Sequence, residues 1–261
     1  MLNLDINGRR VTVRKGTTLL QACREAGFSV PTLCHHEVLE PYGACRLCVV
    51  EIRLPGRSKT RIVTACNYPA KAGLQVETDS EAVLATRREV MDLLLARCPA
   101  SPEIRELAAS FGIHRSSYPA DQNRDNCILC GMCVRICDKL GFAAIAQAGR
   151  GPDREIAPPL KEPPPDCVGC GSCARICPTQ NIPLVERQGM RQIWGRDFEL
   201  VACTQCGKTF ITKEYRDRRI ADSGLPAAHF ELCDECSRVQ TAKTMYKHMV
   251  PADAAEKGAA R

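Results

Sequence analysis

The hydrophobic pattern of the amino-terminal part of the chain predicts a small sheet. Residues 2–6 and 10–14 alternate apolar and polar side chains, and an Asn-Gly pair lies between the two runs. Asn-Gly between two alternating runs is the strongest short-range signal for a β-hairpin. The segments VVEIR, RIVTA and LQVET, at 49–53, 61–65 and 74–78, predict further strands. A strand pair, a helix and more strands around a cysteine-bearing loop together predict a β-grasp domain.

Two amphipathic segments predict helices. Thr17 or Thr18 caps the stretch TLLQACREAG, and Gly27 ends it, because glycine readily adopts the left-handed conformation that follows a helix. Its predicted buried face contains Leu19, Leu20, Cys23 and Ala26. Residues 81–97 repeat apolar side chains at helical spacing, which predicts a longer amphipathic helix. Its predicted apolar face contains Val83, Leu84, Val90, Leu93 and Leu94.

Other segments carry loop or terminal signals. Residues 138–166 include a cluster of prolines, which cannot pair as an interior strand and therefore predict an extended surface loop. Residues 53–62 are basic, and we interpret them as a solvated hairpin tip in preference to an anion site. After Cys236 the stretch SRVQTAKTMYKHM is expected to be helical, and residues 251–261 are expected to fray.

The cysteine content adds metal chemistry to this picture. The chain has 18 cysteines among 261 residues, whereas aromatic residues make up 5%. Small folds with few large apolar side chains and many thiols are typically stabilised by metal ligation. The amino terminus has no continuous apolar segment of the kind that directs export, and no apolar stretch is long enough to span a membrane. We therefore expect thiolate ligands in a cytoplasmic protein, and not a disulfide framework.

The centre of the chain contains the spacing C-x2-C-x2-C-x3-C twice, from Cys127 to Cys137 and from Cys167 to Cys177. This spacing is typical of a two-cluster ferredoxin, in which the fourth cysteine of each run ligates the other cluster. The predicted [4Fe–4S] ligands are Cys127, Cys130, Cys133 and Cys177 for one cluster, and Cys167, Cys170, Cys173 and Cys137 for the other. Gly131 and Gly171 lie where the backbone must pass close to inorganic sulfide. Paired zinc knuckles or disulfides are the alternatives.

A second group of four cysteines lies in the predicted β-grasp domain. Its members are Cys34, Cys45, Cys48 and Cys66, with the spacing C-x10-C-x2-C-x17-C. Plant-type [2Fe–2S] ferredoxins use C-x4-C-x2-C with a distant fourth cysteine, so the first gap here is longer. Four thiolates still suffice for a two-iron cluster, which needs two per iron. Zinc is one alternative and a Rieske-type ligand at His35 is another; otherwise His35 and His36 are expected beside the cluster or in solvent.

The last group, Cys203-x2-Cys206 and Cys233-x2-Cys236, resembles a zinc ribbon. In that fold two knuckles from separate hairpins give a closed tetrahedral site of four thiolates. We predict Zn²⁺ there, with rubredoxin-type iron or a further [4Fe–4S] cluster as alternatives. Cys23 and Cys98 then remain, and both are interpreted as buried apolar fillers.

The sequence PTLCHHEVLEPYGACRLCVVEI, followed by TAC, resembles the amino-terminal [2Fe–2S] domain of the large iron–sulfur subunit of complex I. It is also similar to the diaphorase small subunit of NAD-linked bidirectional hydrogenases and to the amino-terminal regions of NAD-dependent formate dehydrogenases and iron-only hydrogenases. The resemblance covers about residues 1–195. In those families a cluster held by one histidine and three cysteines follows the two-iron domain. Here the corresponding region has Cys98 and, well downstream, His114, so we expect that cluster to be absent.

These observations predict an α+β protein with several small domains. The expected parts are a β-grasp [2Fe–2S] domain at 1–78, a helical connector at 79–120, a double-cubane bacterial-ferredoxin-like domain at 121–195, a zinc-ribbon-like four-cysteine module at 196–250 and a frayed tail at 251–261. The tail module is an addition to the pattern of the resembled families, so its role cannot be carried over from them.

The sequence contains no nucleotide-binding motif and no nucleophile–base constellation, so we expect no substrate site of its own. The resemblance implies an electron-transfer subunit between a flavin-containing NAD(P)H-oxidising subunit and a second catalytic subunit or a ferredoxin. The whole complex would be of the hydrogenase, formate dehydrogenase or electron-bifurcating reductase type.

The alternative is a redox-sensing regulatory or nucleic-acid-binding protein. The formal net charge is +6 with thiols counted as neutral, but four loaded sites of roughly −2 each would remove that excess. The chain also lacks a basic recognition helix with interleaved aromatic residues. We therefore expect no nucleic-acid partner and no direct membrane insertion.

Overall fold

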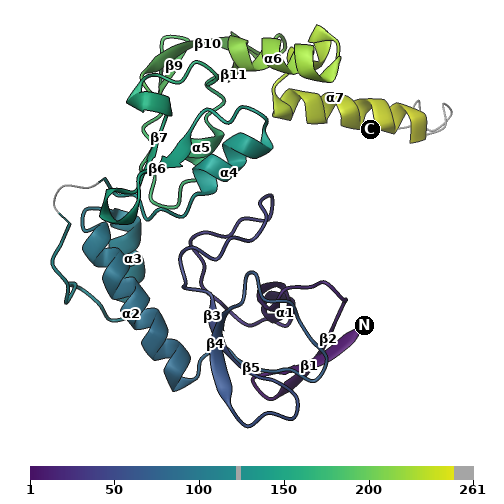
Figure 1. The fold of residues 1–261 in the computed structure, drawn as a ribbon. Helices are drawn as coiled ribbons and strands as arrows, with labels where there is room; N and C mark the ends of the chain where they lie inside the picture. The colour runs from purple at the N-terminus through teal and green to yellow at the C-terminus, as the bar shows by residue number, and fades with distance from the viewer. Residues whose placement is uncertain (122–124, 250–261) are drawn as a thin grey trace, which may run out of the picture. The chain divides into compact units, whose positions relative to one another are not determined.

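The computed structural model describes residues 1–121 and 125–249 (Figure 1). By its internal contacts the chain divides into two compact units. The first unit comprises Met1–Lys161 and Ser172–Ile182; the second comprises Glu162–Gly171 and the described residues from Pro183 onward. The chain therefore passes between the units more than once, inside the region predicted to form the ferredoxin-like domain. Among the described residues, no helix is long and apolar enough to cross a membrane.

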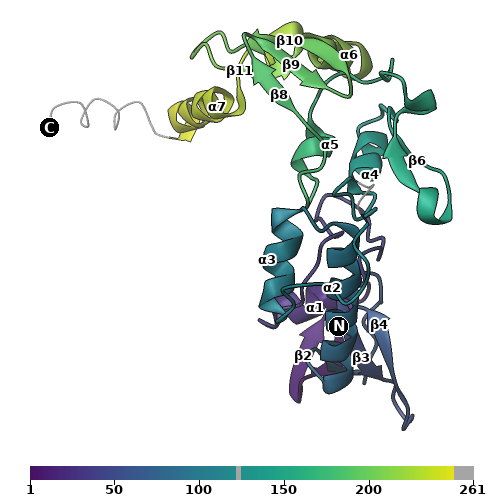
Figure 2. The ribbon, with the colours of Figure 1, turned by 90° about the vertical axis from the view of Figure 1, so that its left-hand side faces the viewer.

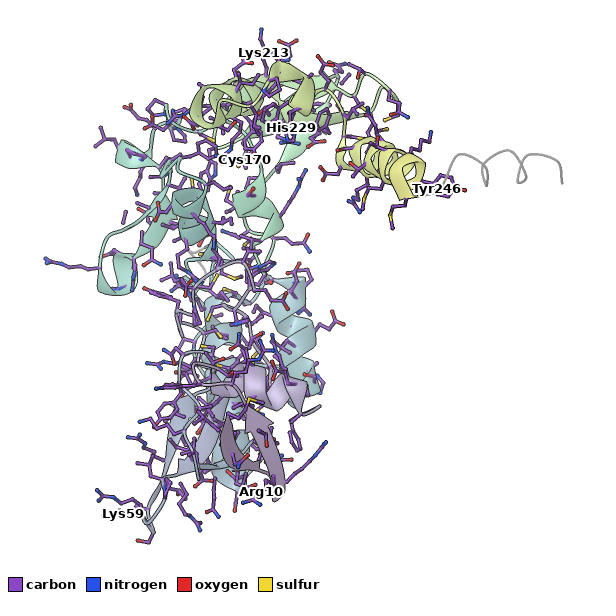
Figure 3. All side chains as sticks on the ribbon, turned by 90° about the vertical axis from the view of Figure 1, so that its right-hand side faces the viewer. Arg10, Lys59, Cys170, Lys213, His229 and Tyr246 are labelled. Carbon is purple, nitrogen blue, oxygen red and sulfur yellow. The ribbon has the colours of Figure 1, made fainter. Side chains whose placement is uncertain are left out.

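A five-stranded mixed sheet forms the amino-terminal part of the first unit, in the order β2-β1-β5-β3-β4. Its strands are β1 (Leu2–Ile6), β2 (Arg9–Val13), β3 (Val49–Arg53), β4 (Thr60–Thr64) and β5 (Gln75–Glu77). β1 and β5 run parallel, and the other neighbours run antiparallel. The predicted strands agree with these bounds within one residue at each end. Lys59, in the basic segment, is exposed at the β3–β4 hairpin tip (Figure 3).

The helix α1 (Leu19–Glu25) packs against this sheet and completes the first core. Thr18 caps it: the Thr18 hydroxyl accepts from the Gln21 amide, and the Gln21 side-chain oxygen accepts from the Thr18 amide. The buried residues of α1 are Leu19, Leu20, Ala22 and Cys23. They contact the apolar side chains of the sheet, among them Leu4, Ile6, Val50, Ile52 and Val76. The mixed α+β class and the amino-terminal sheet are confirmed.

The helix α2 (Glu81–Arg97) has the predicted bounds, but of the five residues predicted for its buried face only Val83 is buried. The buried residues of α2 are Val83, Arg87, Met91, Leu95 and Ala96, whereas Leu93 is 48% exposed. The first four recur at every fourth position, with an arginine among them. Arg87 turns inward because the carbonyl groups of Leu47 and of Val49, at the start of β3, accept its hydrogen bonds. Because the hydrophobic pattern counts Arg87 as polar, it assigns the buried face to the wrong side of the helix.

In the predicted ferredoxin-like region, a glycine directly precedes each of the two cysteine-containing helices. Gly131, at φ +70°, precedes α4 (Met132–Lys139), and Gly171, at φ +77°, precedes α5 (Ser172–Arg175). The two helices pack together within the first unit. The remaining elements of the unit are α3 (Pro102–Ser110), β6 (Ala146–Ala148), β7 (Glu155–Ala157), η1 (Gly151–Asp153) and η2 (Pro159–Lys161).

The segment 138–166, predicted as an extended loop, contains a hairpin. β6 and β7 pair antiparallel, with Ala146 opposite Ala157. The prediction was wrong for this part because the strands lie in the residues just before the prolines. The prolines themselves remain outside the strands, as their missing amide donor requires.

The second unit is built on an antiparallel four-stranded sheet in the order β11-β10-β9-β8, which Figure 2 shows beside α6. Its strands are β8 (Val185–Arg187), β9 (Met190–Ile193), β10 (Arg196–Ala202) and β11 (Thr209–Thr212). The helices that follow are α6 (Lys213–Ser223), η3 (Ala227–Phe230) and α7 (Asp234–Met249). Tyr246 projects from α7 into solvent (Figure 3). The tail at 251–261 lies outside the described residues.

The carboxy-terminal cysteine pairs differ from the zinc-ribbon expectation in one respect. Cys203 and Cys206 lie in the turn of the β10–β11 hairpin, as expected. Cys233 and Cys236 lie instead at the start of α7. The expectation of a second hairpin was therefore wrong. A C-x2-C pair needs only a turn that directs both sulfur atoms toward the same point, and the first turn of a helix provides this as well as a hairpin does.

The close approach of the 162–171 segment to the sheet of the second unit generates a stability prediction. Gly169 has φ +65°, and a Cβ built on it would lie 2.5 Å from ring atoms of the fully buried Phe198. Gly189 has φ +76°, but a Cβ there meets nothing within 4 Å. Gly169→Ala is expected to lower the thermal midpoint of the loaded protein strongly. Gly189→Ala should cost about 1–2 kcal/mol, the penalty for a left-handed residue with a Cβ.

Thermal unfolding followed by circular dichroism and by cluster absorbance would measure this difference. Equal midpoints for the two variants would contradict the packing of Phe198 under Gly169.

Candidate metal centres

The four amino-terminal cysteines are all buried and converge on one loop. Cys48 precedes β3 and Cys66 follows β4, and the pairing of these strands continues as a bond of 2.9 Å from the Ala65 amide to the Cys48 carbonyl. Cys34 and Cys45 lie on the loop before β3, where the Cys45 amide donates to the Cys34 sulfur at 3.4 Å. The structure therefore brings together all four predicted residues of this group.

The thiols of this group associate in two pairs. A hydrogen bond from Cys45 holds the pKa of Cys34 at about 6, and one from Cys66 holds the pKa of Cys48 at about 7. The pKa of Cys45 and that of Cys66 are raised, because each shares its proton with its partner and is buried. A two-iron cluster takes two thiolates on each iron, so this arrangement in pairs fits that group.

Arg87 clamps the same loop from outside the sheet. Its Nε donates to the Leu47 carbonyl at 3.1 Å and its Nη2 to the Val49 carbonyl at 2.7 Å, on either side of Cys48. The side chain is 5% exposed. Sequence reasoning missed this residue, and the single available signal was its place in the four-residue repeat of α2.

The first ferredoxin-like run lies with its predicted fourth member inside the first unit. Burial, followed by charges that include Cys177, raises the pKa of Cys127, and burial followed by Cys177 raises that of Cys130 to about 11. The Leu129 amide donates to the Cys127 sulfur at 3.4 Å, and Arg97 Nε donates to the Cys127 carbonyl at 2.7 Å. Cys177 therefore belongs to the same unit as this run, and the grouping of the four thiols stays a prediction.

The second predicted set is divided between the two units, with Cys137 and Cys173 in the first and Cys167 and Cys170 in the second. In the first unit the Ala144 amide donates to the Cys137 sulfur at 3.3 Å. The grouping of these four thiols stays a prediction.

The segment that carries Cys167 and Cys170 is held by hydrogen bonds within the second unit. The Gly169 amide donates to the Cys167 sulfur at 3.4 Å. Arg191 and Arg196 donate to the carbonyls of Gly169, Cys170, Cys167 and the two preceding prolines. Both arginines come from the sheet, so the sheet fixes the shape of this loop.

The carboxy-terminal cysteines form a compact group in the second unit. The four sulfur atoms of Cys203, Cys206, Cys233 and Cys236 all lie within 4.8 Å of one another. The sulfurs of Cys206 and Cys233 are 3.8 Å apart. Zn–S bonds of about 2.3 Å in a tetrahedron give sulfur–sulfur edges of about 3.8 Å, so the group fits one ion. A cube bonds each thiolate to a separate iron and therefore needs a wider spread of sulfur atoms.

Backbone hydrogen bonds hold the two halves of this group together. The Thr204 amide donates to the Glu231 carbonyl at 2.9 Å, which ties the hairpin to the segment before α7. Hydrogen bonds from backbone amides, first that of Cys233, lower the pKa of Cys203 to about 6, which favours the thiolate that a metal requires.

The remaining candidates lie where the sequence suggests. Cys23 and Cys98 are fully buried, and burial raises their pKa values to about 11 and about 12. His36 and His114 are exposed, and His35 is partly buried.

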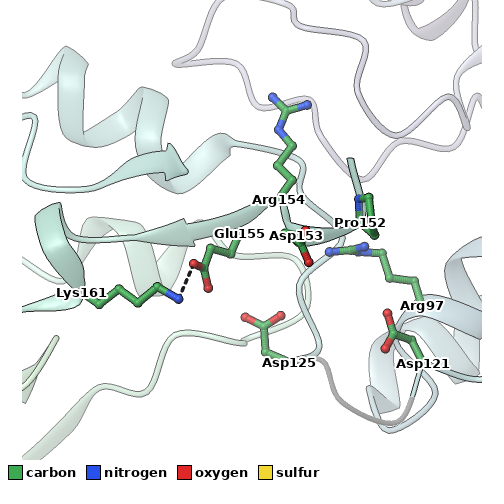
Figure 4. Close-up of a pocket in the computed structure, with 8 residues that line it drawn as sticks. All are labelled: Arg97, Asp121, Asp125, Pro152, Asp153, Arg154, Glu155 and Lys161. Atoms are coloured by element: carbon green, nitrogen blue, oxygen red, sulfur yellow. Dashed lines mark ion pairs between the residues drawn. The ribbon is translucent and has the colours of Figure 1, made fainter. Parts of the chain in front are cut away.

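An open pocket of about 610 Å³ lies in the first unit near Cys127 (Figure 4). Its lining residues are Arg97, Asp121, Asp125, Pro152, Asp153, Arg154, Glu155 and Lys161. Lys161 pairs with Glu155 at 2.7 Å. Because acidic and basic groups are mixed around it, the pocket favours neither an anion nor a cation, and we assign it no ligand.

Comparison with protein families identifies two cluster-binding regions. Residues 1–81 match the family described as 2Fe-2S iron-sulfur cluster binding domain. Residues 166–211 match the family described as 4Fe-4S dicluster domain. The second match contains the run from Cys167 to Cys177 together with Cys203 and Cys206, and it begins after the first run.

Curated relatives extend this result. The chain is 33% identical over 175 residues to the NADPH-Fe(3+) oxidoreductase subunit alpha of Geobacter sulfurreducens, covering 58% of this chain and 20% of that protein. It is 29% identical over 188 residues to the mitochondrial NADH-ubiquinone oxidoreductase 78 kDa subunit of Neurospora crassa, covering 62% and 25%. The corresponding 75 kDa subunit of Reclinomonas americana gives 29% over 181 residues, covering 60% and 26%. The chain thus spans about a fifth to a quarter of the length of these relatives.

A solved structure shows a similar fold. A chain in the crystal structure of NAD+-reducing [NiFe]-hydrogenase in the H2-reduced state matches with a TM-score of 0.60 and 29% identity. The match covers 69% of this chain and 86% of that one.

The Arg87 clamp predicts a specific effect on the amino-terminal site. Arg87→Met removes both donors beside Cys48, and each buried carbonyl left without a donor costs about 1–3 kcal/mol. We expect fewer two-iron spins per chain, measured by EPR after dithionite reduction, and a lower thermal midpoint. Arg88→Met, at the next and exposed position of α2, is the matched control and should retain the signal. A full two-iron signal with an unchanged midpoint in Arg87→Met would show that the clamp is dispensable.

Geometry and comparisons point to the same chemistry. The paired thiols of the amino-terminal loop lie in the segment that matches a 2Fe-2S family, and the second cysteine run lies in the segment that matches a 4Fe-4S family. The chain is therefore an iron–sulfur protein with 2Fe–2S and 4Fe–4S domains, related to the 75 and 78 kDa subunits of NADH-ubiquinone oxidoreductase and to the NAD+-reducing hydrogenase.

Proposed function

We propose that this protein is an electron-transfer subunit of a multisubunit NAD(P)H-linked oxidoreductase. It would pass single electrons between a flavin-containing NAD(P)H-oxidising subunit and a second redox subunit or a ferredoxin. The observation that carries the proposal is the presence of a 2Fe–2S and a 4Fe–4S domain in one chain whose relatives belong to NADPH-, NADH- and NAD+-linked oxidoreductases. A hydrogenase, a formate dehydrogenase or an electron-bifurcating reductase would each fit.

The residues present fit the groups that this function needs. Cys34, Cys45, Cys48 and Cys66 would hold the [2Fe–2S] cluster; Cys127, Cys130, Cys133 and Cys177 one [4Fe–4S] cluster; and Cys167, Cys170, Cys173 and Cys137 the other. When bound, each cluster stores and releases one electron. The two thiol pairs of the first set support the first assignment, and the location of all four cysteines of the second set in one unit supports the second.

The chain itself contributes ligation, burial and hydrogen bonding. Amides directed at sulfur, such as that of Cys45 toward Cys34, stabilise thiolate charge in the buried loops. The sequence offers no nucleotide-binding motif, so NAD(P)H oxidation belongs to a partner. A hydride carries two electrons, which the partner's flavin would hand over one at a time, so this subunit would turn over twice for each NAD(P)H.

The carboxy-terminal site has a different role in this proposal. A single Zn²⁺ held by four thiolates has no redox chemistry and closes a structural site. In this chain it would join the β10–β11 hairpin to the start of α7, which otherwise share few contacts.

The regulatory alternative, in which the tail grips nucleic acid, is disfavoured by the charges of α6. Arg216 pairs with Asp217 at 2.9 Å and Arg218 with Asp222 at 3.0 Å. Acidic residues of the same helix therefore offset part of its basic character, and phosphate binding depends on unpaired basic charge.

Rapid mixing with the flavoprotein partner tests the main proposal. On addition of NADH or NADPH under anaerobic conditions, freeze-quench EPR should show the two-iron signal appearing first and the four-iron signals afterwards. Omission of the flavoprotein is the control and should give no reduction. Reduction that reaches the two-iron centre but never the four-iron centres contradicts an electron-transfer role for the whole chain.

Metal analysis tests the assignment of the sites. Anaerobically purified protein is expected to contain about ten irons and one zinc per chain. Cys206→Ser should remove zinc and leave iron unchanged, whereas Cys23→Ala, at a buried thiol outside the proposed sites, should retain both. About fourteen irons without zinc would assign a cube to the tail, and about eleven without zinc would assign it a rubredoxin-type iron.

A further inference from the structure

Arg135 links the ferredoxin-like helix α4 to the amino-terminal cysteine loop. It lies between Cys133 and Cys137, which are proposed ligands of different cubes. Its Nη1 donates to the Glu40 carbonyl at 2.7 Å and its Nη2 to the Cys34 carbonyl at 3.1 Å. These partners are 95 and 101 positions away in the sequence but belong to the same compact unit. One guanidinium therefore contacts the backbone of a proposed two-iron ligand from the helix that carries four-iron ligands.

The surroundings of Arg135 hold it in this position. The guanidinium carbon lies 5.2 Å from the centre of the Tyr42 ring, at a distance typical of a cation–π contact. Tyr42 belongs to the same loop as Glu40, so the arginine contacts that loop with its plane as well as with its donors. Three contacts from one planar group fix the loop against α4 in both position and rotation.

The charge of Arg135 is left without an acidic partner. Its contacts are carbonyl groups and an aromatic ring, and within the described part of the chain no carboxylate forms an ion pair with it. Its Nε is buried and has no hydrogen-bond partner among the described residues. A buried donor and an uncompensated positive charge fit a neighbourhood that becomes negative when thiolates and clusters are in place.

The internal repeat supplies a natural comparison. The sequences CVRIC at 133–137 and CARIC at 173–177 place Arg135 and Arg175 at equivalent positions. Arg175 is exposed, whereas Arg135 is partly buried against the loop. The spacing of the cysteine run therefore does not by itself direct the arginine inward, and the contact is specific to the repeat that faces the two-iron domain.

We propose that Arg135 couples the two-iron centre to the four-iron centre to which Cys133 is assigned. It fixes the distance between them by holding the Cys34–Glu40 loop on α4, and its charge raises the reduction potential of both, since positive charge stabilises the more negative reduced state. Arg135 is a positioning residue and takes no part in bond chemistry. The inference rests on the proposed function, because it presupposes that both centres carry electrons.

Two substitutions separate the geometric role from the electrostatic one. Arg135→Met removes both the charge and the donors, and Arg135→Lys keeps the charge but cannot reach two carbonyls as a planar fork. Arg175→Met is the matched control at the equivalent, exposed position. Iron analysis first establishes that each variant is loaded.

EPR-monitored redox titration and the magnetic interaction between the reduced centres provide the readouts, and neither needs a partner protein or turnover. In Arg135→Met both potentials should shift downward and the spin–spin splitting should weaken. Arg135→Lys should keep potentials close to those of the unchanged protein while the splitting weakens. Arg175→Met, at an exposed position, should leave the splitting unchanged and should shift the potentials less than Arg135→Met does.

The outcomes distinguish this inference from the function on which it rests. Unchanged potentials and splitting in loaded Arg135→Met overturn the coupling role, as does an equal shift in Arg175→Met. If Arg135→Met fails to retain iron, Arg135→Lys decides: wild-type splitting in that variant overturns the positioning role. Failure of the unchanged protein to accept electrons from a flavoprotein would count against the proposed function and would leave these spectroscopic results intact.

Discussion

The loops that carry the cysteines depend on arginine donors for their carbonyl groups. Their amides turn toward sulfur, as those of Leu33, Cys45, Leu129 and Gly169 do. Where backbone amides donate to sulfur, the regular hydrogen bonds between backbone groups are interrupted, so carbonyls beside the cysteines lack backbone donors. Guanidinium groups from distant elements supply the missing donors; they belong to Arg87, Arg97, Arg135, Arg191 and Arg196. Each unpaired buried carbonyl would cost about 1–3 kcal/mol, so the shape of the loops rests on these bonds.

The same arginines place positive charge beside the cysteines, where the proposed thiolate ligands and clusters would bring negative charge. Burying a guanidinium is costly unless an anion or several acceptors compensate it. Arg87 and Arg191 are 5% and 2% exposed and lie beside cysteines of two different loops. Arg191 is compensated in part by its ion pair with Glu186 at 2.7 Å, whereas Arg87 donates to two carbonyl groups. Burial meanwhile raises the pKa of Cys130 to about 11, so that thiol would have to lose its proton to serve as the proposed ligand. The polypeptide is therefore better matched electrostatically to the loaded state than to the free thiols.

The carboxy-terminal site uses cysteine in another way. Its sulfur atoms lie within 4.8 Å of one another, and Cys206 is exposed, so a small closed tetrahedron fits better than a buried multinuclear core. In the proposed assignment the same C-x2-C spacing would serve two kinds of chemistry in one chain. A hairpin turn and a helix start together bring these four sulfur atoms within 4.8 Å of one another.

The sequence by itself determined the parts whose geometry is local. The Asn-Gly hairpin, a threonine cap at position 17 or 18, the bounds of α2 and the cysteine runs all depend on residues a few positions apart, between which the chain geometry is nearly fixed. The inward turn of Arg87, the Arg135 contact with Cys34 and the helix start beneath Cys233 and Cys236 could not be foreseen in this way. Only the tertiary structure decided these features. The two arginines donate to carbonyl groups about forty and one hundred positions away in the sequence, which only folding brings close. Hydrophobic periodicity gives no sign of such a contact, because it counts every arginine as a polar residue.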